Sequence, residues 1–128
     1  SADMVNWTDH GTIAVSGSKG AAKWSANSWA PAVCHKKING KEKFFLYFAN
    51  NASSIGVLTA DSPTGPWTDP IGKPIIDRSI TGCAESEIGW LFDPAVLVDD
   101  DGTGYLYFGG IGDRRIYPQS EMCTSCKT

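Results

Sequence analysis

The sequence predicts an all-β protein, and three observations support this fold class. Aromatic residues are frequent, with five Trp, four Tyr and five Phe in 128 residues, and they suit strands better than helices. Fourteen Gly and seven Pro provide for many turns. No segment shows the apolar period of an amphipathic helix with capping residues at its ends. We therefore expect short antiparallel strands joined by tight turns.

The first half of the chain contains three runs of strand length. Residues 32–35 and 43–48 are rich in apolar and aromatic residues, and between them lies Asn39-Gly40, a dipeptide typical of two-residue hairpins. Residues 55–60 form a third run, which a turn rich in Pro and Gly follows before Trp67. This order predicts a hairpin and a third antiparallel strand.

An internal repeat covers most of the chain. Its matched features keep one order and recur after 60 to 63 positions: Trp7-Thr8-Asp9 with Trp67-Thr68-Asp69, Pro31-Ala32-Val33 with Pro94-Ala95-Val96, Asn39-Gly40 with Asp101-Gly102, and Leu46-Tyr47-Phe48 with Leu106-Tyr107-Phe108. The second copy places strands at residues 95–98 and 104–108 around a turn at residues 99–102.

A unit of about 60 residues with three or four strands has the size of a β-propeller blade that carries long loops. We predict an outer strand of one blade at residues 1–15, a blade at about residues 24–70 and the following blade at about residues 90–128. A β-sandwich with accidental internal similarity is the alternative. Propellers close with about 4–8 blades, so we interpret the chain as a propeller fragment, with the remaining blades elsewhere, including on separate chains.

Charge and hydropathy exclude several classes of partner. The net charge is −3 and the basic residues are scattered, whereas nucleic-acid binding needs a basic face. No apolar run approaches the roughly 20 residues that span a bilayer, so we expect neither nucleic acid nor membrane as a partner. No signal peptide is visible at Ser1, which predicts that a leader was removed or that the chain begins within a longer protein.

The four cysteines are Cys34, Cys83, Cys123 and Cys126, of which the last two form a C-x-x-C. A zinc site needs a second pair of ligands, and the two histidines lack the usual spacing. A redox motif would need a βαβ context, which is missing. We expect no metal and no cofactor, and structural disulfides or free thiols in a secreted protein, with three full pairings open.

Five phrases in register resemble the family 43 glycoside hydrolases, which are five-bladed β-propellers that cut arabinose or xylose from plant polysaccharide. They lie at residues 3–7, 29–31, 55–57 with 61–67, 92–96, and 99–102 with 105–107. The resemblance covers residues 3 to about 110, and residues 111–128 match nothing that we can place. It implies a partial catalytic propeller domain over residues 1–128.

The resemblance also implies three carboxylates in a central pocket, namely a general base, an aspartate that tunes the pKa of the acid, and a general acid. The Phe-Asp-Pro-Ala motif carries the second, so it assigns Asp93 to pKa modulation and substrate orientation. The base would lie before Ser1 and the acid beyond the recognisable sequence. Trp29 and Phe92 resemble walls of the sugar pocket, and we expect Asn50, after an inner strand, to face it.

Each of these residues has a structural alternative. Asp before Pro often opens a turn, Trp29 fits core packing, and Asn50 fits a turn. For the other polar residues we favour structural roles over sites: a solvated hairpin turn over a calcium loop for Asp99–Asp101, packing over catalysis for His35, and a loop without an acid motif for Glu85 and Glu87.

The chemistry of inverting glycoside hydrolysis fits this division of labour. An acid protonates the leaving oxygen while a base activates water, and a neighbouring carboxylate keeps the acid protonated by like-charge repulsion. We predict a secreted arabinoxylan-degrading hydrolase, an α-L-arabinofuranosidase or β-xylosidase, whose substrate is a pentose-containing polysaccharide or oligosaccharide. The alternatives are a non-catalytic carbohydrate-binding propeller and an inactive proteolytic remnant.

Overall fold

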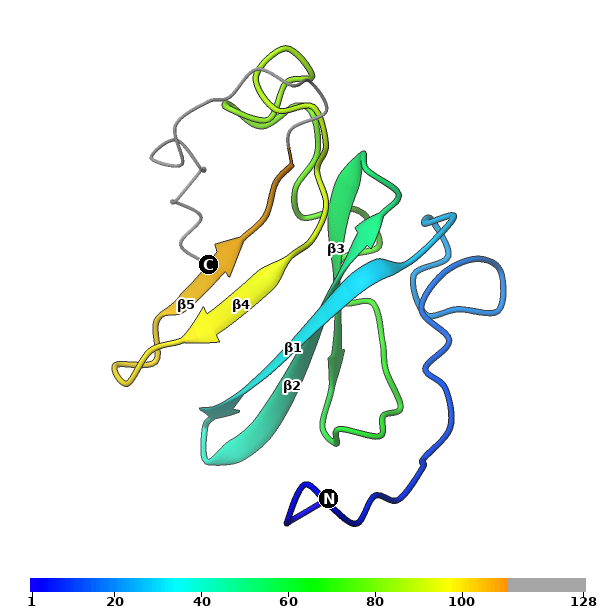
Figure 1. Cartoon of the computed structure of the whole chain (residues 1–128), viewed down its shortest axis with the longest axis vertical. Coiled ribbons are helices and arrows are strands. Elements are labelled where there is room, and N and C mark those ends of the chain that lie inside the picture. Colours follow the sequence, from blue (N-terminus) through cyan, green and yellow to red (C-terminus); the bar gives the residue numbers. More distant parts are fainter. Residues whose placement is uncertain (111–128) are drawn as a thin grey trace.

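The computed structural model describes residues 1–110, whose strands form two antiparallel sheets (Figure 1). The first sheet has the order β1–β2–β3, with β1 at Trp29–Ile38, β2 at Lys41–Asn50 and β3 at Ser54–Ala60. The second is a hairpin of β4, Ala95–Val98, and β5, Gly104–Tyr107. The described part of the chain contains no helix, and thus none long and apolar enough to cross a membrane. The predicted all-β class is confirmed.

The hairpin between β1 and β2 turns at Asn39-Gly40, as predicted. Both residues have left-handed backbone angles, with φ of 51° and 79°, and Ile38 pairs directly with Lys41. Two consecutive positive φ angles define a type I′ turn, whose twist matches that of the flanking strands. Asn and Gly are the residues that tolerate these angles best, so the dipeptide fixes the register of the hairpin.

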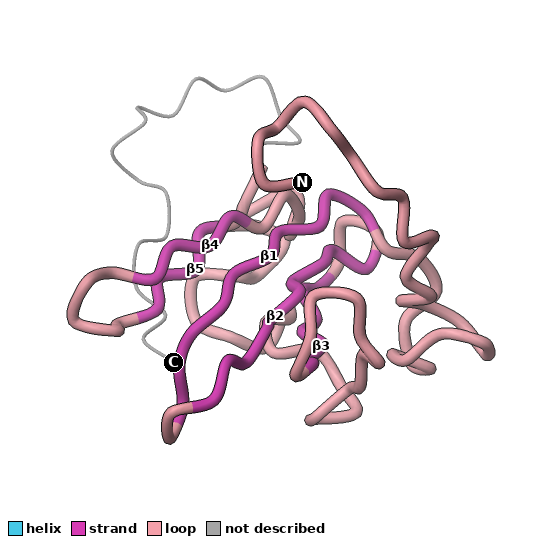
Figure 2. The backbone as a smooth tube through the Cα atoms, turned by 90° about the horizontal axis from the view of Figure 1, so that it is seen from below, coloured by secondary structure: helices cyan, strands magenta, loops and turns pink. Residues whose placement is uncertain are grey.

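The two sheets are neighbouring blades whose first strands lie against each other. Strands β1 and β4 lie side by side in both views (Figures 1 and 2), and their arrows in Figure 1 point in the same direction. Toward the far end of these strands, Lys36 Nζ on β1 donates a hydrogen bond to the carbonyl of Gly102 in the turn between β4 and β5. The starts of β1 and β4 therefore lie at the opposite, common end.

Strand β2 divides its side chains between two apolar cores. Tyr47 and Ala49 contribute to a core that includes Leu106 and Phe108 from the second blade. Leu46 and Phe48 contribute to a core on the other face of the sheet. This alternation follows from the two-residue period of a strand. Because one core contains side chains from both blades, packing couples the blades to each other.

The outer edge of β3 is covered by residues 68–76, but only in part. Thr59 and Thr68 exchange backbone hydrogen bonds of 2.8 and 2.9 Å. The pairing then stops, because Pro70 has no N–H to donate and Asp69 Oδ1 accepts two backbone N–H groups of the following turn, at 3.0 and 2.8 Å. The second Trp-Thr-Asp thus contributes one isolated bridge, between Thr59 and Thr68.

The described part of the chain has no strand at residues 1–15, and the outer strand predicted there for another blade stays a prediction. The Asp3 carboxylate accepts the backbone N–H groups of Val5 and Asn6, at 3.0 and 2.8 Å, which bends the chain into a turn. Trp7 is 72% exposed, and no described strand lies beside it to share its backbone hydrogen bonds. The second blade, expected at about residues 90–128, extends beyond the described residues.

We predict that Phe48→Ala destabilises the protein by about 3–5 kcal/mol, because the side chain is fully buried. Its ring stacks on Trp24 with centroids 5.8 Å apart, and a Cβ added to Gly56 would come within 2.5 Å of it. Denaturant unfolding of the domain measures this loss. Phe44→Ala, on the same strand but half-buried, is the control, with an expected loss of about 1 kcal/mol. Equal losses for the two variants would contradict this packing.

Candidate active site

The candidate site lies where β1 and β4 begin. Trp29 is the first residue of β1, and Phe92 and Asp93 precede Ala95, the first residue of β4. Since the two strands run side by side in one direction, their starts lie at the same end of the blades (Figure 1). The structure thus brings Trp29, Phe92 and Asp93 to one end of the inner strands, where β2 also ends at Asn50.

Asp93 occupies an unusual backbone conformation. Its φ is 50°, although the residue before a proline normally adopts an extended backbone. Ala30, its counterpart in the repeat, has a φ of 44° and also precedes a proline. Such angles cost on the order of 1–3 kcal/mol, and Asp tolerates them better than Ala does. Each blade therefore begins its inner strand with a left-handed residue, and in the second blade that residue carries a carboxylate.

The Asp93 carboxylate is exposed and makes no hydrogen bond or ion pair within residues 1–110. A simple turn opener normally uses its carboxylate to accept nearby backbone N–H groups. Asp101 does this, since its Oδ1 accepts the N–H of Thr103 at 2.7 Å and that hydrogen bond lowers the pKa of the carboxyl. Asp93 is instead available to a ligand or to groups outside the described residues.

Two exposed tryptophans and one half-buried phenylalanine surround this end of the strands. Trp29 is 48% exposed, and Trp90 is 50% exposed and meets the Phe92 ring edge to face, with centroids 5.2 Å apart. Trp90 is a candidate that sequence reasoning missed. It precedes Phe92 by two residues in extended chain, and that spacing places side chains on one face.

The position of Phe92 is fixed by its neighbours. Its carbonyl accepts the N–H of Gly109 at 3.0 Å, and Trp90 N–H donates to the carbonyl of Gly110 at 3.2 Å. A Cβ on Gly110 would come within 1.8 Å of the Phe92 ring, so that position requires glycine. The aromatic wall therefore rests on close backbone packing within the second blade.

Asn50 lies at the same end, where its side chain accepts hydrogen bonds from the backbone before β1. Its Oδ1 accepts the N–H groups of Ala26 and Asn27, at 3.0 and 3.3 Å. The side chain of Asn27 in turn donates to Asn51 Oδ1 at 2.7 Å. These contacts tie the segment that leads into Trp29 to the turn between β2 and β3. The predicted contact of Asn50 with substrate stays a prediction.

The other polar candidates lie in structural contacts. Asp99 Oδ1 accepts the N–H of Asp100 at 2.8 Å within the hairpin turn, as favoured over a calcium loop. His35 Nδ1 lies 2.9 Å from Glu42 Oε2 on exposed neighbouring strands. Glu87 Oε2 accepts the N–H of Ala84 at 3.2 Å, which closes a turn. Within residues 1–110 no group of three or more His, Cys, Asp or Glu is arranged to hold a metal.

The space between the two blades has a volume of about 250 Å³ and is lined by Cys34 and Tyr47. Cys34 is a free thiol, and burial raises its pKa, so it stays protonated and weakly nucleophilic at neutral pH. Burial, and to a lesser extent Cys34, raises the pKa of Tyr47 to about 12. Cys83 lies in the core, and Cys123 and Cys126 fall outside the described residues.

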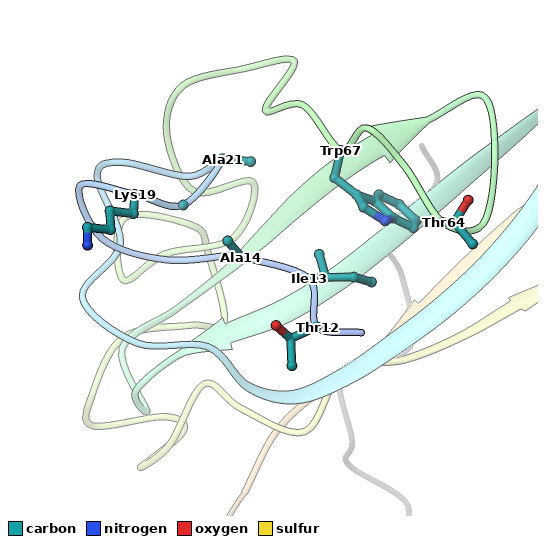
Figure 3. Close-up of a pocket in the computed structure, with 8 residues that line it drawn as sticks. Thr12, Ile13, Ala14, Lys19, Ala21, Thr64 and Trp67 are labelled. Atoms are coloured by element: carbon teal, nitrogen blue, oxygen red, sulfur yellow. The ribbon is translucent and has the colours of Figure 1, made fainter. Parts of the chain in front are cut away.

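A larger hollow of about 390 Å³ lies on the other face of the first blade (Figure 3). It is lined by Thr12, Ile13, Ala14, Lys19, Gly20, Ala21, Thr64 and Trp67. These residues include no carboxylate and no histidine.

Two antiparallel sheets whose first strands lie side by side are typical of neighbouring β-propeller blades. A carboxylate and aromatic side chains lie where these strands begin. The pattern of the glycosyl hydrolases family 43 matches residues 1–124. An arabinoxylan arabinofuranohydrolase of Paenibacillus polymyxa is 67% identical over 116 residues, which cover 86% of this chain and 18% of that relative. The chain belongs to glycoside hydrolase family 43.

Solved structures agree with this assignment. A family 43 arabinoxylan arabinofuranohydrolase from Bacillus subtilis, in complex with cellotetraose, matches with a TM-score of 0.83 and 63% identity, over 92% of this chain and 25% of that chain. An α-L-arabinofuranosidase from Clostridium thermocellum matches with a TM-score of 0.67 and 42% identity, over 85% and 34%. The chain thus spans a quarter to a third of these structures.

We predict that Asn50→Ala lowers the stability of the protein by about 1–2 kcal/mol, because two backbone N–H groups lose their acceptor. Asn50→Asp keeps an acceptor oxygen at the same place and should retain most of the stability. Thermal unfolding and the KM for substrate distinguish the two roles of this residue. If Asn50 only holds the backbone, Asn50→Asp has a KM near that of the unmodified protein. If its amide contacts the sugar directly, KM rises in both variants.

Proposed function

We propose that the protein that carries this chain is a glycoside hydrolase that removes α-L-arabinofuranosyl groups from arabinoxylan with inversion. The observation that carries the proposal is the exposed Asp93 carboxylate, held in a left-handed conformation before β4, at the end of the inner strands where Trp29 and Phe92 also lie. Membership of family 43 supports the reaction class. Relatives described as arabinoxylan arabinofuranohydrolases support arabinose over xylose as the sugar released.

Asp93 acts in this proposal through its charge and its hydrogen-bonding oxygens. Inverting hydrolysis needs a protonated carboxylic acid beside the leaving oxygen at a pH where exposed carboxyls are ionised. A negative charge nearby disfavours ionisation of that acid and so raises its pKa. The Asp93 carboxylate also accepts hydrogen bonds from sugar hydroxyls and orients the ring. The general acid and base come from other parts of the parent protein.

The aromatic side chains complete the site by binding the sugar. Trp29 and Phe92 offer flat apolar faces that suit the C–H face of a pentose, and nearly half of the Trp29 surface is open to a ligand. A ring of blades is needed to enclose a central pocket, and about 4–8 blades close one. We propose that the parent supplies the others on one polypeptide, which the greater length of the relatives supports, since the aligned segment is 18% of one of them.

Secretion follows from the proposed substrate. A polysaccharide does not cross a membrane, so an enzyme that acts on it has to meet it outside the cell. We predict that most of the arabinofuranosidase activity of the source organism, captured with antibodies to this chain, is found in the medium or at the cell surface. Activity confined to the lysate would contradict this localisation.

The proposed function is tested by hydrolysis of arabinoxylan with the full-length parent and its Asp93→Asn variant. The unmodified protein should release free arabinose with inversion and cleave p-nitrophenyl arabinofuranoside faster than the xyloside. Asp93→Asn should lower kcat by about 10²-fold or more, because the charge that holds the acid protonated is lost. Asn tolerates the left-handed backbone as well as Asp does, so stability should not fall.

The matched control is Asp100→Asn, which removes the same charge from the exposed hairpin turn seven residues along the chain and should leave kcat unchanged. Full activity of the Asp93→Asn variant would overturn the role of this residue. Binding of arabinoxylan without release of sugar would identify a carbohydrate-binding propeller instead.

A further inference from the structure

Arg78 lies in the loop between the blades and donates hydrogen bonds to four backbone carbonyls. Nη1 donates to Ile88 and, at 3.3 Å, to Cys83. Nη2 donates to Gly89 at 2.8 Å and to Ala52 at 3.0 Å. Sequence reasoning assigned no role to this residue. One half-buried guanidinium thus binds three carbonyls of the loop and one carbonyl of the preceding blade.

The four carbonyls bracket the segment that leads to the candidate site. Ile88 and Gly89 stand immediately before Trp90, Leu91 and Phe92 in the chain. Ala52 belongs to the turn between β2 and β3, and its carbonyl also accepts the N–H of Leu91 at 2.9 Å. Leu91 is fully buried and forms a parallel bridge with Ser53. The segment between Arg78's acceptors and Asp93 is therefore hydrogen-bonded at both ends, through the carbonyls of Ile88 and Gly89 at one end and that of Phe92 at the other.

Arg78 has no acidic partner in the described part of the chain. The three ion pairs found there join His35 or Lys37 to Glu42 and Lys43 to Asp61. The positive charge is balanced by carbonyl dipoles, which depend on geometry. A guanidinium is a rigid planar fork whose donors point in fixed directions, whereas a lysine ammonium is a single point charge. The arrangement therefore selects arginine for its shape as well as its charge.

We propose that Arg78 is a positioning residue for Asp93: it fixes residues 88–92 on the turn after β2 and thereby sets where the Asp93 carboxylate stands. This inference rests on the proposed function, because it concerns the reaction in which Asp93 takes part. Arg78 acts through the backbone of the second blade and not by contact with sugar. Its loss shifts the carboxylate away from the general acid, and misplacement by about 1 Å can cost about 10²-fold in rate.

The alternative is that Arg78 only stabilises the fold. A structural role lowers the unfolding temperature and the fraction of folded protein, and it leaves the pH profile of the folded enzyme unchanged. A positioning role changes the pH profile, because a more distant Asp93 carboxylate raises the pKa of the general acid less. The basic limb of kcat/KM, which reports that acid in the free enzyme, then moves to lower pH.

The experiment compares Arg78→Lys and Arg78→Gln in the full-length parent with Lys73→Gln, which removes one positive charge from an exposed position of the same loop. All assays use p-nitrophenyl arabinofuranoside well below the unfolding temperature, with the folded fraction measured by circular dichroism. We expect kcat to fall about 10- to 100-fold in the arginine variants with a smaller change in KM. The basic limb should move to lower pH, and Lys73→Gln should match the unmodified enzyme.

A second measurement keeps the proposal falsifiable if Arg78→Gln does not fold. Arg78→Lys is combined with Asp93→Asn, and the double variant should be no slower than Asp93→Asn alone, since Arg78 acts through the residue already removed. Multiplying effects, or an unshifted basic limb with kcat lowered only in proportion to the folded fraction, would overturn the proposal. If the unmodified enzyme releases no pentose, the proposed function fails instead.

Discussion

The relative placement of the two blades depends on their shared apolar core and on hydrogen bonds to the carbonyl of Ala52. This carbonyl accepts the Leu91 N–H at 2.9 Å and Arg78 Nη2 at 3.0 Å. Two residues earlier, Asn50 accepts two N–H groups of the segment that enters β1. One turn of four residues thus holds the approach to Trp29 on one side and to Asp93 on the other. Buried backbone groups need such partners, so the positions of Trp29 and Asp93 depend on the geometry of this turn.

Local chemistry made much of the fold predictable. The Asn39-Gly40 turn set the register of the first hairpin, and the recurrence of Leu46-Tyr47-Phe48 as residues 106–108 located the second blade. Three site candidates, Trp29, Phe92 and Asp93, do meet at one end of the inner strands. The turn signal is local, whereas the second blade was located from a recurrence 60 positions along the chain.

The features that sequence reasoning missed depend on partners far along the chain. The outer strand predicted at residues 1–15 would pair with another blade, so it stays a prediction, and the described residues show only a turn at Asp3. Arg78 satisfies carbonyls from positions 52 to 89, a pattern that composition does not reveal. Its one visible sign is a lone arginine in a loop rich in isoleucine. The two backbone N–H groups that Asn50 accepts come from the segment before β1, a contact that the local sequence does not reveal, and its predicted contact with sugar stays a prediction.

The matching left-handed backbone of Ala30 and Asp93 has a consequence for how such proteins evolve. Duplication of a blade copies this left-handed backbone conformation, whichever side chain the new position carries. A single codon change is then enough to install a carboxylate that already points the right way, and another is enough to erase it. The propeller can therefore gain, lose or move an acidic residue around its axis without a change of backbone. Ala30 is a position with the same backbone conformation as Asp93 but without a carboxylate.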